Sequence, residues 1–162
     1  MKKANDMSTV YRARPRSRQR GVAAVELGLL LTPLVLMLFG TTELGRAIYS
    51  YNTLSKTVRD AARHLSQHGP GDTTIATEAR CLAVYGNSDC SGTAVAPGLT
   101  TAMVSLCDAT LCSGTHANQP TGLGSVNLVT VAIQGYTYNS LVQFVVPSMT
   151  FNNISVTLRA QL

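Results

Sequence analysis

A long uncharged run is the strongest pattern in this sequence, and a helical pattern follows it without a break. Residues 27–42 contain no charged side chain. Counted from Val22, the apolar stretch covers about 20 residues, or roughly 30 Å as a helix, which is enough to cross a bilayer. Beyond it, apolar residues recur at alternating steps of three and four, as on one face of an amphipathic helix. They are Leu44, Ala47, Tyr51, Leu54, Val58, Ala61 and Leu65.

These two patterns predict one helix over residues 22–67. Gly69, Pro70 and Gly71 end it, because glycine and proline do not continue helix geometry. At 1.5 Å per residue the helix is about 70 Å long. We expect residues 22–42 to span the membrane, and residues 43–68 to lie against a soluble domain formed by residues 72–162.

The shorter patterns of residues 72–162 predict one helix and a few strands. We expect a helix over residues 73–84, ended by Gly86 and Asn87. Residues 154–162 alternate apolar and polar side chains, as in a half-buried antiparallel strand. A second strand places Val129, Val131 and Ile133 on one face, and its phase changes across Gly135 to Tyr136 and Tyr138, as a bulge would cause.

Residues 141–146, closed by Pro147, and the alternating residues Ala102, Val104 and Leu106 are weaker strand candidates. The expected fold class is therefore α+β and pilin-like: a long N-terminal helix, membrane-spanning and then amphipathic, packed on a small antiparallel sheet.

The net charge of +5 belongs to the N-terminal leader and not to the domain. Seven basic residues precede the apolar run, against Asp6 alone: Lys2, Lys3, Arg12, Arg14, Arg16, Arg18 and Arg20. Cationic flanks stay in the cytoplasm, so residues 1–21 are expected to be a disordered cytoplasmic leader, with the C-terminal domain outside. A nucleic-acid-binding arm is the rival interpretation, but no aromatic platform or nucleic-acid-binding fold motif accompanies the arginines. Contact with anionic lipid fits them better.

Four cysteines, Cys81, Cys90, Cys107 and Cys112, lie downstream of the expected span, in what is then an oxidising compartment. An even set in that setting favours two disulfides. Three connectivities are open, of which pairing of neighbours is the simplest. A four-cysteine zinc site is the alternative, but the gaps between the cysteines lack the short Cys-x-x-Cys spacing of structural zinc sites.

Glu26 is the residue of the apolar helix that most requires an explanation. A carboxylate inside a membrane span costs about 2.5–3.5 kcal/mol on insertion scales, so it needs a partner or a function. A glutamate that snorkels to the headgroups is the plainer alternative. Pro33 removes the usual donor for the carbonyl of Leu29 and predicts a kink there. Ala24 and Gly28 have the small-xxx-small spacing of close helix packing.

The other candidate groups have weaker support. Glu43 and Arg46 are spaced for a local ion pair at the outer interface. His64 and His68 have the i,i+4 spacing of metal ligands without a nearby third ligand in the sequence, which favours a solvated helix end. Ser105, Ser113 and His116 are hydrolase residue types, but neither a nucleophile-elbow pattern nor a phosphate loop accompanies them. We expect no catalysis, no cofactor and no metal.

Three segments resemble the TadE-like family of pilin-related proteins from tight-adherence (Flp) pilus systems. They are Arg20-Gly21-Val22-Ala23-Ala24-Val25-Glu26-Leu27, Phe39-Gly40 through Glu43-Leu44-Gly45-Arg46-Ala47, and Val58-Arg59-Asp60-Ala61-Ala62-Arg63. The resemblance implies that a prepilin peptidase cuts after Gly21, so that Val22 becomes the first mature residue and Glu26 the fifth. It also implies no enzymatic activity and a role as a minor pilin or pseudopilin. The chain departs from the family pattern at Leu27, where members tend to carry an aromatic residue.

These inferences together predict a single-pass protein of the bacterial inner membrane, with a cytoplasmic N-terminus and a periplasmic domain, that can enter an extracellular pilus. The implied partners are a prepilin peptidase, other pilin or pseudopilin subunits, the inner-membrane assembly platform and membrane lipids, with no nucleic acid. Glu26 could pair with the α-amino group of a neighbouring Val22. One alternative is an uncleaved, signal-anchored periplasmic binding protein. Another is a secreted enzyme, which would need a pocket with convergent titratable groups.

Overall fold

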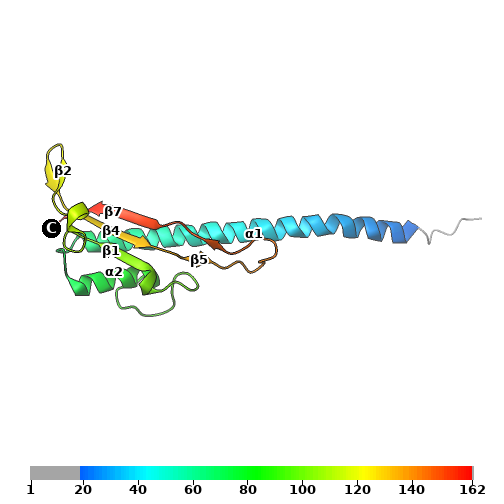
Figure 1. The fold of residues 1–162 in the computed structure, drawn as a ribbon. Coiled ribbons are helices and arrows are strands. Elements are labelled where there is room, and N and C mark those ends of the chain that lie inside the picture. The colour runs from blue at the N-terminus through cyan, green and yellow to red at the C-terminus, as the bar shows by residue number, and fades with distance from the viewer. Residues whose placement is uncertain (1–18, 162) are drawn as a thin grey trace, which may run out of the picture. The chain divides into compact units, whose positions relative to one another are not determined.

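The computed structural model describes residues 19–161, and its chain divides into two units, Met1–Leu38 and Phe39–Leu162. The expected leader lies mostly outside the described residues. The helices are α1 (Gln19–Ser66), α2 (Thr73–Tyr85) and α3 (Ser113–His116), with a 3₁₀ turn over Thr101–Met103. The strands are β1 (Val104–Cys107), β2 (Gln119–Thr121), β3 (Gly124–Val126), β4 (Leu128–Ile133), β5 (Thr137–Tyr138), β6 (Met149–Thr150) and β7 (Ile154–Arg159) (Figure 1). The α+β class predicted from the sequence is confirmed.

Within the first unit, helix α1 is almost completely uncovered. Every side chain described from residue 21 to residue 34 is exposed, and Pro33 lies inside the helix without interrupting it. Pro33 has no N–H, so the carbonyl of Leu29 lacks its helical donor. At the preceding carbonyl, that of Gly28, the Thr32 hydroxyl donates a hydrogen bond at 3.0 Å. The long helix predicted for residues 22–67 is therefore present, with its last residue at Ser66.

Within the second unit, one face of α1 is part of the hydrophobic core. Ala47, Leu54, Val58, Ala61 and Leu65 are buried, as their spacing predicts. The prediction was wrong for Leu44 and Tyr51, which are exposed, because the chain beside them, which includes Phe151, contacts this part of the helix without covering it. These two residues instead line an apolar groove with Ala47, Ile48, Met149 and Phe151.

A three-stranded antiparallel sheet in the order β1-β4-β7 covers that face of the helix. Val131 in the central strand is opposite Leu106 on one side and Val156 on the other. Val129, Val131 and Ile133 are buried, as predicted, and after Gln134 the buried positions change phase to Tyr136 and Tyr138. Strand β4 ends there, and Gly135 adopts a φ of +69°, in the left-handed region that glycine occupies without strain.

Strand β7 and helix α2 lie close to the predicted ranges. In β7, Ile154 is buried and Val156 and Leu158 are partly buried, while Ser155, Thr157 and Arg159 are exposed. The strand ends at Arg159, and Leu162, which the prediction included, lies outside the described residues. Helix α2 begins after Asp72, whose carboxylate accepts from the backbone N–H of Thr74 at 2.8 Å, and it ends at Gly86 in the left-handed region.

Two of the weaker strand predictions need correction. Residues 141–146 form turns between β5 and β6, because the N–H groups of Val145 and Val146 both bond to the carbonyl of Val142 and not to a neighbouring strand. Ala102 lies in the 3₁₀ turn before β1, so only Val104 and Leu106 take buried strand positions. The short hairpin β2–β3 was not predicted from the sequence pattern.

Both disulfides join neighbours in the sequence, Cys81 with Cys90 and Cys107 with Cys112. The simplest of the three open connectivities is therefore the one the structure adopts. The paired sulfurs leave no thiolate among the four cysteines for the alternative zinc site.

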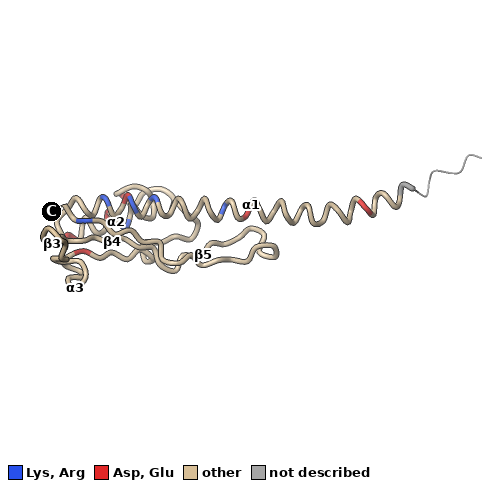
Figure 2. The backbone as a smooth tube through the Cα atoms, turned by 90° about the horizontal axis from the view of Figure 1, so that it is seen from above, with Lys and Arg blue, Asp and Glu red and all other residues tan. Residues whose placement is uncertain are grey.

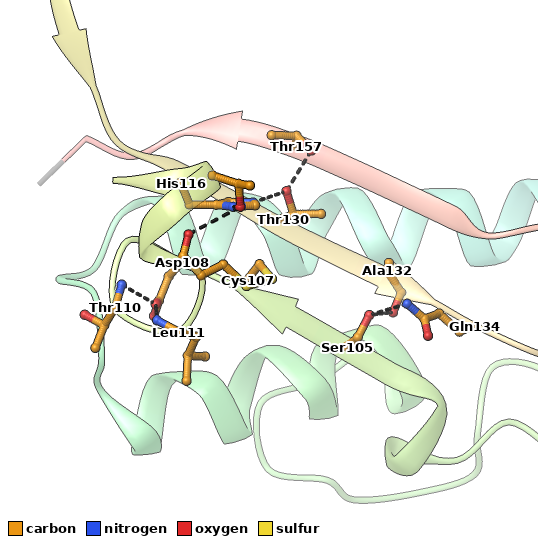
Figure 3. Close-up of a disulfide and its surroundings, with 12 residues drawn as sticks. Ser105, Cys107, Asp108, Thr110, Leu111, His116, Thr130, Ala132, Gln134 and Thr157 are labelled. Atoms are coloured by element: carbon orange, nitrogen blue, oxygen red, sulfur yellow. Dashed lines mark hydrogen bonds between the residues drawn. A yellow bond between two sulfur atoms is a disulfide. The ribbon is translucent and has the colours of Figure 1, made fainter. Parts of the chain in front are cut away.

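Asp108 anchors the loop that the second disulfide closes. Its buried carboxylate accepts from the N–H groups of Leu111 at 2.6 Å and Thr110 at 2.8 Å (Figure 3). It also accepts from the N–H of Gly71 at 2.9 Å, which joins this loop to the turn between α1 and α2. Burial alone would raise the pKa of Asp108, but these backbone donors, with a smaller effect of His116, hold that pKa below its ordinary value.

Asp108→Asn is expected to lower the free energy of unfolding at pH 7 by about 1–3 kcal/mol, because it replaces a charged acceptor of three N–H groups. A depressed pKa in the folded state gives stability that is present above the unfolded pKa and is lost as the pH falls through the folded value. The difference between wild type and variant should therefore shrink below about pH 4. Thermal unfolding of the full chain in detergent, at pH 7 and pH 3, measures it. Asp60→Asn, at an exposed position of α1, is the matched control, and an equal effect of both changes at pH 7 would contradict this role.

Candidate functional site

The residues predicted for processing lie in the first turns of α1. Gly21 has no atom within 4 Å of the position that a Cβ would take, and Val22 and Glu26 are both exposed. A second protein can therefore approach the backbone at Gly21 without displacing any described part of this chain. Glu26 makes no hydrogen bond or ion pair through its side chain with any other described residue.

The residues predicted for helix packing share the same uncovered segment. Ala24 and Gly28 are one helical step of four apart, and no atom lies within 4 Å of a Cβ built at Gly28. Large apolar side chains surround them on all sides of the helix: Val22, Val25, Leu27, Leu29, Leu30, Leu31, Leu34, Leu36, Met37 and Leu38 are all exposed. Within the described residues, α1 is the one helix long and apolar enough to cross a membrane.

A polar cluster around one buried carboxylate, formed by Glu43, the partly exposed Arg46, Tyr138 and Ser140, marks the point where the uncharged run ends. Glu43 is 3% exposed. Its Oε1 accepts from Arg46 Nη1 at 2.8 Å, and its Oε2 accepts from the Tyr138 hydroxyl at 2.9 Å. The Arg46 guanidinium also lies 5.9 Å from the centre of the Tyr138 ring, within reach of a cation–π interaction.

The charge of Glu43 is stabilised by its neighbours in spite of its burial. Burial alone would raise the pKa of this carboxyl, but hydrogen bonds from the Tyr138, Arg46 and Ser140 side chains, with the charge of Arg46, hold it below the ordinary value. Burial and the hydrogen bond to Glu43 raise the pKa of Tyr138, so its hydroxyl remains a donor at neutral pH. The cluster therefore joins α1 to strand β5 through a charged hydrogen bond.

The ion pair between Glu43 and Arg46 was predicted, but its burial and its third partner were not. Tyr138 lies 95 residues away in the sequence. No local pattern connects the two positions. The phase change after Gly135 predicted that Tyr138 faces inward, but it did not predict that Tyr138 meets Glu43.

The remaining candidate groups do not form a catalytic centre in the structure. His64 is not simply solvated, since its Nε2 lies 2.9 Å from Glu78 Oε2 of helix α2, a contact between helices that the spacing of His64 and His68 could not show. The Ser105 hydroxyl bonds to the carbonyl of Ala132, and His116 Nε2 lies 2.8 Å from the Thr130 hydroxyl. Figure 3 shows Ser105, on β1, well apart from His116, which lies on α3 beside Thr130.

Among the described residues, one group has metal-ligand atom types close together. The Sγ atoms of Cys107 and Cys112 and a ring nitrogen of His116 lie within 4.8 Å of one another. The two sulfurs are bonded to each other, and both ring nitrogens of His116 lie within hydrogen-bond distance of threonine hydroxyls, those of Thr115 and Thr130. As a disulfide, the two cysteines do not offer the deprotonated thiols that a metal would require.

Comparison with known proteins supports the resemblance seen in the sequence. Residues 21–63 match the family model described as TadE-like protein. The matched segment contains Gly21, Glu26 and the ion pair of Glu43 with Arg46, and it confirms the resemblance for this part of the chain. No curated protein and no solved structure matches the chain.

The contact between Glu43 and Tyr138 predicts a measurable coupling. Tyr138→Phe and Glu43→Gln should each lower the midpoint of thermal unfolding at pH 7, and the double variant should lose less than the sum, because both changes remove the same charged hydrogen bond. The loss caused by Tyr138→Phe should diminish as the pH falls through the folded pKa of Glu43, where the carboxylate takes up a proton.

Tyr136→Phe is the matched control, since it removes a neighbouring buried hydroxyl that donates to the carbonyl of Pro97. The loss of unfolding midpoint caused by Tyr136→Phe should add to that caused by Glu43→Gln. If the losses caused by Tyr138→Phe and Glu43→Gln also add, the contact between Tyr138 and Glu43 contributes nothing to stability.

Proposed function

We propose that this protein, with a TadE-like segment over residues 21–63, is a minor pilin or pseudopilin of a tight-adherence pilus, processed by a prepilin peptidase and acting in pilus assembly or initiation. One observation carries the proposal. The matched segment opens on an uncovered glycine and continues as an apolar helix without cover, interrupted by a single carboxylate at Glu26. Such a surface is stable in lipid or among other apolar helices, and not in water.

Processing would separate the cationic leader from this helix. The basic residues keep the N-terminus in the cytoplasm, so the bond between Gly21 and Val22 lies at the cytoplasmic edge of the membrane. Cleavage there removes charges that would oppose extraction of the helix from the bilayer. It also creates a new α-amino group on Val22, four residues before Glu26.

In an assembly of apolar helices, Glu26 would accept the charge of a neighbouring subunit's α-amino group at Val22. Each charge alone is costly in an apolar surrounding, and the pair lowers that cost when the geometry permits a hydrogen bond. The close packing this requires is compatible with Ala24 and Gly28, which place no bulky side chain on their part of the helix surface.

The role is one of binding, and it requires no chemistry from this chain. Its partners would be a prepilin peptidase, other pilin or pseudopilin subunits, the inner-membrane assembly platform and membrane lipids. The protein would sit in the inner membrane with its N-terminus in the cytoplasm and its disulfide-bonded domain in the periplasm, where disulfides persist.

The N-terminal sequence and intact mass of the protein, recovered from membranes of its own host, test the proposal. We expect the chain to begin at Val22. A chain that begins at Met1 would contradict processing and leave a signal-anchored periplasmic binding protein. A chain that begins beyond Tyr49 would mean that the apolar helix serves only for secretion.

Glu26→Ala is expected to lower recovery of the protein in the pilus fraction by about tenfold or more, because the neighbouring amino group is left without a partner in an apolar surrounding. Glu26→Gln should behave alike, since it keeps the shape and removes the charge. Val25→Ala, a change at an adjacent exposed position, should assemble as wild type. Assembly of Glu26→Ala at the wild-type level, with cleavage complete, would exclude this role for the carboxylate.

A further inference from the structure

The loop between β5 and β6, residues 139–148, has an unusual composition for an exposed segment. It contains no charged side chain, and no Asp, Glu, Lys or Arg occurs anywhere from residue 117 to residue 158. Figure 2 shows this stretch without blue or red along the hairpin of β5. Surface loops of soluble domains are normally polar, so the composition indicates a different environment.

Two large apolar side chains project from the tip of this loop. Leu141 is 77% exposed and Phe144 is 84% exposed, whereas Val142, Val145 and Val146 are partly covered. The turn is held by its own hydrogen bonds, from Val145 and Val146 to the carbonyl of Val142 and from the N–H of Val142 to the Ser140 hydroxyl. The loop therefore presents Leu141 and Phe144 from an ordered backbone.

The loop lies beside the last turn of the uncharged run of α1. Val145 Cγ1 is 3.9 Å from the position that a Cβ would take at Gly40, an ordinary van der Waals distance. The hydrogen bond between Tyr138 and Glu43 fixes the base of the hairpin against the next turn of the helix. The expected span ends at residue 42, and Glu43 is the first charged residue after it. Gly40 is therefore close to the outer end of the span, and so is the loop beside it.

We propose that this loop is a second membrane contact, in which Leu141 and Phe144 insert into the boundary between headgroups and acyl chains of the outer leaflet. The inference rests on the proposed membrane anchoring by α1 and adds a site that the anchoring does not require. Phe39, one residue before Gly40, is a further large apolar side chain that is exposed on the helix.

The position of the loop favours lipid as its occupant. If residues 22–42 span the bilayer, lipid surrounds the helix at the level of Gly40, and the loop beside Gly40 must share that environment. Insertion is limited to the boundary region, about 5–10 Å deep, because irregular backbone is not tolerated in the hydrocarbon interior. The absence of charge means that the contact does not depend on anionic lipid, unlike a polybasic segment.

Single tryptophans test the contact directly, because the chain contains none. The full chain carrying Phe144→Trp is placed in phosphatidylcholine vesicles with and without bromine on the acyl chains near the headgroup. We expect the tryptophan emission to be weaker in the brominated vesicles than in the vesicles without bromine. We also expect the emission maximum in vesicles to lie at a shorter wavelength than that of the same variant in buffer without lipid or detergent. Leu141→Trp should behave alike, and the addition of anionic lipid should change neither result.

Two further variants make the outcomes distinguishable. Leu123→Trp, at the fully exposed turn between β2 and β3, is the matched control and should show no quenching. Leu34→Trp lies near the middle of the expected span, so it is measured in vesicles with bromine near the ends of the acyl chains, and it reports whether α1 is in the bilayer. Quenching of Leu34→Trp without quenching of Phe144→Trp would overturn the loop contact and leave the proposed anchoring intact.

Phe144→Trp could be protected from iodide in water and yet not be quenched by brominated lipid. That result would mean that protein covers the loop, for example a second copy of the chain. It would also overturn the proposal. An unquenched Leu34→Trp would remove the membrane anchoring and this inference together.

Discussion

The exposed apolar surface of α1 is the constraint on which the rest of the structure depends. From residue 21 to residue 34 the described side chains are uncovered, and half of them are large and apolar. Burying a leucine side chain is worth about 1.5–3 kcal/mol, so the ten large apolar residues that are exposed from Val22 to Leu38 make water a poor surrounding for this segment. The proposed function surrounds it with lipid or with other apolar helices. The disulfide-bonded domain, by contrast, covers its own core with one face of the same helix and one face of a small sheet.

The polar cluster of Glu43, Arg46, Tyr138 and Ser140 occurs where these two surroundings meet. A carboxylate with 3% of its surface exposed is stable there because the charged and hydroxyl donors around it replace water. Because Tyr138 reaches this carboxylate from strand β5, the hairpin is held against α1 at the end of the uncharged run. This hydrogen bond fixes the position of the hairpin on the helix. Hydrophobic packing alone does not do so, because it is not directional.

The distribution of charge gives the two ends of the chain different chemistry. The leader is strongly basic, while residues 117–158 carry no Asp, Glu, Lys or Arg. Two disulfides and the three N–H groups that bind Asp108 hold loops of the domain. This arrangement leaves the β5–β6 loop free to be apolar beside Gly40, which is the basis of the proposed second membrane contact.

The sequence by itself determined the elements whose causes are local. Spacing, glycine and side-chain period act within a few residues, and they account for the extent of α1, the C-terminal end of α2, the alternation in β7 and the phase change after Gly135. The residues that resemble the TadE-like family are local in the same sense, since they lie on one helix and match as a block.

Only the tertiary structure decided the contacts between distant segments. Glu43 meets Tyr138 across 95 residues, His64 meets Glu78 on another helix, and residues 141–146 turn beside Gly40 and do not extend as a strand. A periodic pattern states which face of an element is apolar, but it does not state which other element will cover that face. That choice depends on how the whole chain packs, so the position of the β5–β6 loop beside Gly40, on which the proposed membrane contact rests, became visible only in the fold.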